Sequence, residues 1–201
     1  SVSGATGSEK NQLIYSFAEN TGKKALVIAS DELSAKEIYA DISSMSGENV
    51  LFFRAKEYVF YDVDVSAREI EAERINVIKN IKNADFIVTS AAAIMQYTVK
   101  KEIFDFYCKT YSAGDIIDVS KLAETLVETG YKRVSQVEGH GQFSIRGSII
   151  DIFFPGDIYG TRIELFDDEI DTIRSFDPLT QMSLENADKF EIYPARELIF
   201  D

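Results

Sequence analysis

The sequence contains very few of the residues on which common catalytic and metal sites depend. It has one cysteine, Cys108, one histidine, His140, and no tryptophan. A single cysteine excludes an internal disulfide framework and a cysteine-based metal site, and a single histidine excludes any site that needs several imidazoles. We therefore expect no metal site built on these residues, and no catalytic triad around the lone His140. The cysteine usage is typical of a cytoplasmic protein, because thiols stay reduced in that compartment.

Long apolar runs and positive charge are also scarce. No apolar run approaches the roughly 20 residues that a membrane-spanning helix needs, so we expect no membrane contact. The net charge of −13 is uneven, because residues 1–110 hold 13 basic and 16 acidic side chains, whereas residues 111–201 hold 8 and 18. A surface this negative repels a phosphate backbone. The charge therefore excludes tight duplex binding by the chain alone and favours a basic protein partner.

The first half of the chain alternates predicted strands with predicted helices. Strand–helix alternation predicts a parallel sheet with helices on both faces. On the second helix, Leu33, Ile38 and Ile42 are predicted to form the apolar side. The predicted strands are Lys24–Ala29, Val50–Phe53 and Asp85–Thr89, and the predicted helices are Lys10–Asn20, Leu33–Met45, Ser66–Ile81 and Ser90–Met95.

The segment before the first predicted strand has the frame of a phosphate-binding P-loop, G-x-x-x-x-G-K-[ST]. It reads GATGSEKN, in which Gly4, Gly7 and Lys10 suit such a loop, but Glu9 replaces the second glycine and Asn11 replaces the hydroxyl residue. The glycine lets backbone N–H groups wrap the phosphates, and the hydroxyl ligates magnesium. A carboxylate directed into that cradle repels a phosphate about 4 Å away by roughly 4 kcal/mol. The pattern indicates a degenerate P-loop or, alternatively, an ordinary glycine-rich turn at the start of a helix.

The pattern changes near residue 110, where one helix, Ser120–Thr129, is followed mostly by short strands. We therefore predict an α/β protein. Residues 1–112 are predicted to form a parallel-sheet domain that begins with the P-loop-like segment, and residues 113–191 are predicted to form a smaller α+β domain with an antiparallel sheet. The segment 192–201 is predicted to begin a return into the first domain. P-loops normally follow a strand, so we also expect a further segment before residue 1.

Three side chains on the polar face of the predicted antiparallel sheet form a candidate binding surface. Neighbouring side chains of a strand point to opposite faces, so Ile163 and Leu165 face the core while Arg162 and Phe166 face away from it. The same alternation places Arg146 on the polar face. Arginines and aromatic residues supply most of the binding energy of protein interfaces. The alternative is that a loop covers Phe166 and that both arginines are solvated and pair with the many nearby acids of the chain.

Four sequence motifs occur together in this chain. They are GATGSEK at 4–10, GHGQFSIRGSIIDIF at 139–153, RIELFDDEIDTIRSFD at 162–177 and IYPARE at 192–197. Together they resemble the N-terminal UvrB-homology module of bacterial transcription-repair coupling factor (Mfd), over nearly the whole chain. UvrB is similar in the same places, but it carries an intact G-x-T-G-S-G-K-T loop and a long tyrosine-rich hairpin. This sequence has the altered loop and only Tyr58–Ser66 where the hairpin would be. Both departures favour the coupling factor.

The resemblance implies a non-catalytic adaptor of transcription-coupled nucleotide excision repair. It implies that the first domain is a helicase-like fold with a degenerate P-loop that has lost ATP use, and that the second domain recruits UvrA through Arg146, Arg162 and Phe166. No cofactor is implied for this chain, because in the intact family member ATP and magnesium serve motor domains further along the chain. RNA polymerase and double-stranded DNA are likewise bound by other domains. The alternative is a fragment of a UvrB-like or other P-loop ATPase or helicase that still binds nucleotide.

Overall fold

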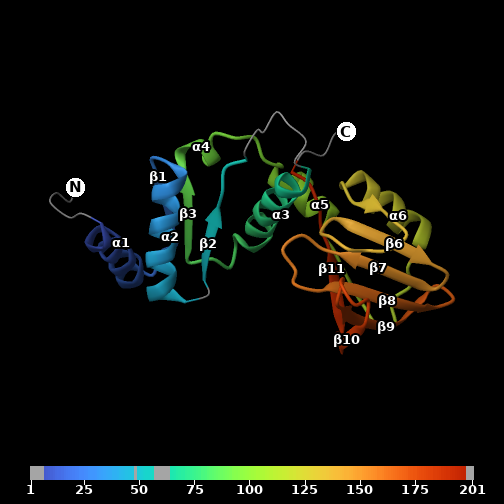
Figure 1. Cartoon of the computed structure of the whole chain (residues 1–201). Coiled ribbons are helices and arrows are strands. Elements are labelled where there is room, and N and C mark those ends of the chain that lie inside the picture. Colours follow the sequence, from blue (N-terminus) through green and yellow to red (C-terminus); the bar gives the residue numbers. More distant parts are fainter. Residues whose placement is uncertain (1–6, 48, 57–63, 198–201) are drawn as a thin grey trace. The chain divides into compact units, whose positions relative to one another are not determined.

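The computed structural model describes residues 7–47, 49–56 and 64–197, and for residues 64–68 it describes the backbone alone. The chain divides into two units, Ser1–Tyr97 and Thr98–Asp201. The first contains a small parallel sheet and the second contains mainly antiparallel strands, so the predicted α/β class is confirmed (Figure 1). Among the helices of the described residues, none is long and apolar enough to cross a membrane.

The first unit alternates helices and strands, as the sequence predicts. In chain order its elements are α1 (Ser8–Thr21), β1 (Ala25–Ala29), α2 (Glu32–Ser46), β2 (Val50–Phe53), α3 (Asp64–Asn80), β3 (Phe86–Ser90) and α4 (Ala91–Ile94). The three strands pair in parallel in the order β1-β3-β2 (Figure 1). On the face of β2 that carries Phe53, α3 lies close to the sheet, and its Arg74 guanidinium carbon is 3.9 Å from the centre of the Phe53 ring.

Helices α1 and α2 build the core of the first unit with the opposite face of the sheet. Ala18 of α1 and Ile38 and Ile42 of α2 are buried in one cluster with Phe86 of β3. The prediction that Leu33 shares this apolar side is wrong, because its side chain is 70% exposed. At about 100° per residue, Leu33 lies roughly 140° around the helix from Ile38. It therefore faces solvent while the other two face the sheet.

The second unit contains the predicted antiparallel sheet and two elements that the sequence analysis missed, α5 and β4. A six-stranded sheet has the order β10-β9-β8-β7-β6-β5, in which only β5 and β6 are parallel, and β11 pairs with β4 in a separate antiparallel ladder. The elements are α5 (Lys101–Tyr107), β4 (Lys109–Ser112), α6 (Val119–Glu128), β5 (Lys132–Arg133), β6 (Gln142–Arg146), β7 (Ile149–Phe153), β8 (Gly160–Phe166), β9 (Glu169–Phe176), β10 (Ser183–Asn186) and β11 (Lys189–Ile192).

The boundary between the units differs from the predicted one. It falls between Tyr97 and Thr98, whereas the prediction ended the first domain at residue 112. Strand β4 lies in the second unit because its partner β11 lies there. After β11, the Tyr193 hydroxyl donates to the carbonyl of Pro155 at 2.9 Å, still inside this unit. Residues 198–201, where the predicted return into the first domain would continue, lie outside the described residues.

The two faces of the six-stranded sheet differ in how they are covered. The core face buries Ile163 completely and leaves Leu165 only 8% exposed, which confirms the predicted alternation in β8. The opposite face, called the outer face below, carries a small buried cluster of Val137, Phe153 and Phe176 near one end of the strands. The candidate residues lie on this outer face, beside and beyond that cluster.

Candidate functional site

The strand register brings three charged residues together on the outer face of the sheet. Asp151 of β7 pairs with Ser144 of β6 on one side and with Arg162 of β8 on the other. Arg146 lies two residues along β6 from Ser144, on the same face. Directly opposite residues of adjacent strands have Cβ atoms about 5 Å apart, and diagonal neighbours remain within reach of long side chains. Arg146, Asp151 and Arg162 therefore form one group, called the Asp151 cluster below.

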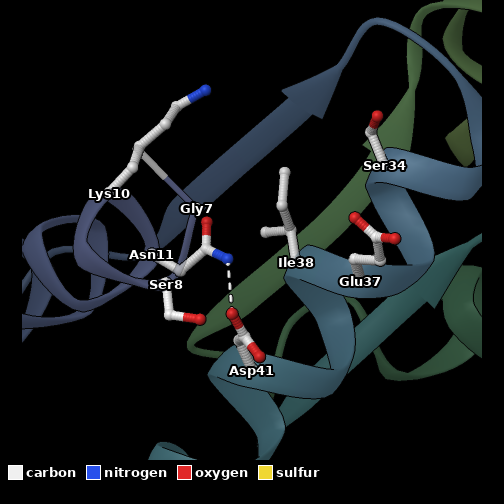
Figure 2. A pocket seen from close by; sticks show the side chains of 8 residues that line it. All are labelled: Gly7, Ser8, Lys10, Asn11, Ser34, Glu37, Ile38 and Asp41. Carbon is white, nitrogen blue, oxygen red and sulfur yellow. Dashed lines mark hydrogen bonds between the residues drawn. The ribbon is translucent and has the colours of Figure 1, made fainter. Parts of the chain in front are cut away.

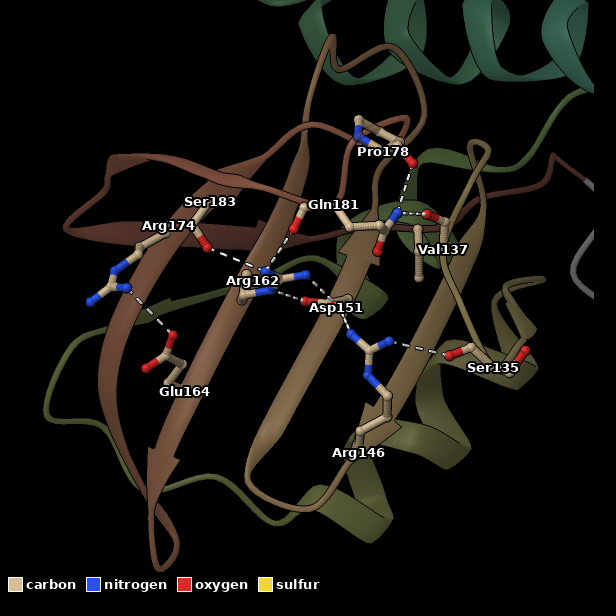
Figure 3. Close-up of polar contacts among 10 residues, drawn as sticks. All are labelled: Ser135, Val137, Arg146, Asp151, Arg162, Glu164, Arg174, Pro178, Gln181 and Ser183. Carbon is tan, nitrogen blue, oxygen red and sulfur yellow. Dashed lines mark hydrogen bonds and ion pairs between the residues drawn. The ribbon is translucent and has the colours of Figure 1, made fainter.

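Asp151 is fully buried, and both of its carboxylate oxygens accept hydrogen bonds from arginines (Figure 3). Arg162 Nε donates to Oδ1 at 2.7 Å and Arg162 Nη2 donates to Oδ2 at 3.1 Å. Arg146 Nη2 donates to Oδ2 at 2.5 Å. A buried carboxylate needs such compensation, because an unpaired charge out of water is very costly. Two cations around one anion leave the cluster with a net charge of +1.

Arg162 is held from several directions and has little contact with solvent. Its side chain is 13% exposed, and its Nη1 donates to the carbonyl of Gln181 at 3.1 Å and to the hydroxyl of Ser183 at 3.2 Å (Figure 3). Its guanidinium carbon lies 4.8 Å from the centre of the Phe176 ring. Hydrogen bonding to Asp151 raises the pKa of the Arg162 guanidinium above its usual value. Arg162 therefore fastens the chain around residues 181–183 to the sheet.

Arg146 and Phe166 are more accessible than Arg162. The Arg146 side chain is 45% exposed, and its contact besides Asp151 is a long hydrogen bond of 3.4 Å from Nη1 to the carbonyl of Ser135. Phe166, at the end of β8, is 79% exposed. The alternative that a loop covers Phe166 is therefore wrong. Both arginines do pair with an acid of the chain, but that acid is the buried Asp151, and Arg162 is not solvated.

The sequence analysis missed Asp151, the residue that joins the two arginines. A signal for it exists, because Asp151 is the one acidic residue in β7, whose other residues are all apolar. Charged side chains are almost never fully buried unless they are paired. An acid in a central strand covered on both faces therefore predicts a cation on a neighbouring strand, although only the register tells which cation it is.

The predicted P-loop region forms a pocket between α1 and α2 (Figure 2). Asn11, which is 5% exposed, donates from Nδ2 to Oδ2 of Asp41 in α2 at 2.8 Å. The side chain that replaces the magnesium-binding hydroxyl is thus tied to a carboxylate. Figure 2 shows the Lys10 side chain extending away from these two residues. The residues that line the pocket are Gly7, Ser8, Lys10, Asn11, Ser34, Glu37, Ile38 and Asp41.

The carboxylate that the sequence predicts in this pocket, that of Glu9, is not the one found there. Glu9 is exposed and does not line the pocket, so the carboxylates that do so are Glu37 and Asp41, both from α2. Gly4, the first residue of the P-loop frame, lies outside the described residues. Within the described ranges no group of three or more His, Cys, Asp or Glu side chains is arranged to hold a metal ion. His140 places Nε2 2.8 Å from the carbonyl oxygen of Asp157.

Comparison with known proteins identifies related sequences over the whole chain. Residues 110–198 match the family model of the UvrB interaction domain. The chain is 34% identical over 201 residues to the transcription-repair-coupling factor of Bacillus subtilis, covering 98% of this chain and 17% of that protein. It is 32% identical over 212 residues to UvrABC system protein B of Thermosipho africanus, covering 98% of this chain and 32% of that protein. The chain thus spans less than a third of the length of either relative.

Proposed function

Since this chain is a UvrB-homology module of the kind found in transcription-repair coupling factors, we propose that it is a non-catalytic adaptor whose second unit recruits UvrA. The observation that carries the proposal lies within residues 110–198, the part that matches the UvrB interaction domain. There the outer face of the sheet presents the Arg146 side chain, which is 45% exposed, and the Phe166 ring, which is 79% exposed, whereas Arg162 on the same face is only 13% exposed. Exposed aromatic rings beside arginines are typical of the centre of a protein interface.

The local charge of this face supports an acidic contact on the partner. Residues 111–201 carry 8 basic and 18 acidic side chains, which by itself favours a basic partner. Around Arg146 the outer face nevertheless carries a net charge of +1, because Arg146 and Arg162 surround the single carboxylate of Asp151. Since exposed charges are screened beyond about 8 Å at physiological ionic strength, the local charge governs the contact itself. We therefore propose that UvrA presents an acidic side chain here.

The wider role in the intact protein follows from the same proposal. A coupling factor that binds RNA polymerase and double-stranded DNA through its other domains would use this module to bring UvrA to stalled transcription. ATP and magnesium would serve the motor of that longer protein and not this chain. A direct titration of the chain with purified UvrA, in which calorimetry measures the heat of binding, tests the proposal. Saturable binding is expected, and no detectable heat or complex at micromolar concentrations would contradict it.

Nucleotide binding is the second candidate function, and the Gly7 to Lys10 frame beside a pocket is the observation that favours it. Against it, Glu37 and Asp41 supply negative charge to the pocket, and Asn11 is already engaged by Asp41. Carboxylates repel phosphate, so we propose that the pocket does not bind magnesium–ATP. Measurable magnesium-dependent ATP affinity of the unmodified chain would favour the ATPase alternative.

Restoring the P-loop sequence with Glu9→Gly and Asn11→Thr is expected to give no ATP hydrolysis. The double substitution returns the glycine and the hydroxyl, but Glu37 and Asp41 remain beside the loop. Phosphoryl transfer also needs a second magnesium ligand and a cation that stabilises the transition state. A phosphate-release assay compares the double variant with the unmodified chain. Turnover above the background of the unmodified chain would show that the catalytic parts are present after all.

A further inference from the structure

We propose that Ile116 and Glu169 form a further contact site for UvrA, which takes an apolar side chain across Ile116 and a basic side chain beside Glu169. The inference rests on the proposed function and extends it to two residues that lie on neither β6 nor β8. Ile116 lies in the segment between β4 and α6, and Glu169 is the first residue of β9. Their place beside Phe166 makes the site continuous with the contact already proposed.

Strand pairing places Ile116, Glu169 and Phe166 in one row on the outer face. Phe166 lies opposite Glu169 across the β8–β9 turn, and Ile116 forms an antiparallel bridge with the same Glu169 from its other side. Two backbone hydrogen bonds of 2.8 and 2.9 Å between the flanking residues close this bridge. Directly opposite residues of antiparallel strands point to the same face of a sheet. Ile116 and Phe166 therefore flank Glu169 on one face.

Both apolar side chains of this row are open to solvent. Phe166 is 79% exposed and Ile116 is 62% exposed, whereas their chain neighbours Leu165 and Ile117 are buried on the core side. Because neighbouring residues of extended chain point to opposite faces, the pairing itself holds Ile116 outward. Two strand spacings of about 4.8 Å place the backbones of Ile116 and Phe166 about 10 Å apart. One partner side chain can therefore lie across both.

The charge around Ile116 sets the chemistry of the partner at this site. The two segments that the bridge joins, residues 115–118 and 167–171, contain six acidic side chains and no basic one. In the part of the chain that the structure describes, Glu169 makes no ion pair. Arg146 is three strand spacings away, about 14 Å, so its charge is largely screened at Glu169. A basic side chain of UvrA is therefore favoured here, in contrast to the acidic one at Arg146.

The test of the apolar contact measures UvrA affinity and thermal melting for Ile116→Ala, with Val127→Ala as the matched control. Both residues are β-branched and more than half exposed, but Val127 lies on α6, outside the row. We expect Ile116→Ala to melt like the unmodified chain and to bind UvrA about fivefold more weakly, because the partner loses an apolar contact. Val127→Ala is expected to bind normally.

A double variant shows whether Ile116 and Phe166 contact the same group of UvrA. Residues that share a partner group lose binding energy together, so their separate losses do not add. Ile116→Ala combined with Phe166→Ala is therefore expected to weaken binding by less than the product of the two single losses. Multiplicative losses would overturn the placement of one partner side chain across both residues.

Glu169→Gln tests the charge of the site separately, and it keeps the inference testable if Ile116→Ala melts early. Removing a charge that pairs with a partner changes the salt dependence of binding. We expect Glu169→Gln to bind UvrA about threefold or more weakly at low salt and to show a shallower salt dependence. Glu128→Gln, an exposed charge on α6, is the control and is expected to leave both unchanged. A purely structural role of Glu169 would not alter the salt dependence.

The outcomes separate this inference from the proposed function. If Phe166→Ala weakens UvrA binding but Ile116→Ala and Glu169→Gln bind as the unmodified chain does, the contact ends at Phe166 and the inference is wrong. The same holds if the two control variants lose as much affinity as the variants of the row. The proposed function survives both results. If instead the unmodified chain does not bind UvrA, the proposed function itself fails.

Discussion

Replacing Arg162 with alanine is expected to lower the free energy of unfolding by about 3 kcal/mol, although the residue lies on the surface-facing side of its sheet. The substitution removes two of the three arginine hydrogen bonds that compensate the fully buried Asp151. Breaking a buried pair on one side costs about 3–5 kcal/mol, because the remaining charge stays out of water. The lower end applies because Arg146 still holds one carboxylate oxygen. The loss of contact with Phe176 adds to the effect.

Arg174→Ala is the matched control for this prediction. Arg174 lies on the same face and pairs with Glu164 at 3.6 Å, but both side chains are about a third exposed. Exposed ion pairs contribute only about 0–1 kcal/mol. Chemical denaturation of both variants compares the two environments directly. Equal stability losses would show that Asp151 is not the costly group that its burial indicates.

Ile163→Ala is expected to destabilise the fold by about 2–5 kcal/mol, whereas Phe166→Ala, three residues later in β8, is expected to leave stability nearly unchanged. Ile163 is completely buried on the core face, so its truncation opens a cavity. The ring of Phe166 is 79% exposed and loses few packing contacts. Thermal melting of the two variants measures the contrast. If Phe166→Ala melts as early as Ile163→Ala, the ring is part of the core and is not an open binding surface.

The strands of the second unit could be predicted from the sequence because alternation is a local signal. It placed Ile163 on the core face and Phe166 on the outer face, as observed. Alternation does not give the register between strands, so the pairing of Arg146 and Arg162 with Asp151 could not be derived from it. Alternation alone therefore leaves open whether the arginines pair with an acid of the chain or with a partner. Their shared contact exists only once β6, β7 and β8 are aligned.

In the first unit, too, local sequence patterns do not determine which side chains meet across neighbouring elements. Its strands and helices follow from their apolar spacing. The side of α2 on which Leu33 lies is predicted wrongly, because Leu33 is roughly 140° around the helix from Ile38 and so lies outside the buried stripe. The pocket charge came from Glu37 and Asp41 of α2, not from Glu9, since only the packing of α2 beside α1 brings them there. In the second unit, strand β4 reads KTYS and has no clear alternation, so its formation depends on β11, about 80 residues later.

The central claim is that the outer face around Phe166 binds UvrA. The most direct test titrates UvrA with three proteins: the unmodified chain, Phe166→Ala and Leu179→Ala. Leu179 is the matched control, because it is a large apolar residue of the same unit and is 90% exposed. We expect the unmodified chain and Leu179→Ala to bind alike. Phe166→Ala is expected to bind more weakly by about 2 kcal/mol, or roughly 30-fold in Kd, with unchanged melting. Equal affinities of all three proteins for UvrA would contradict the claim.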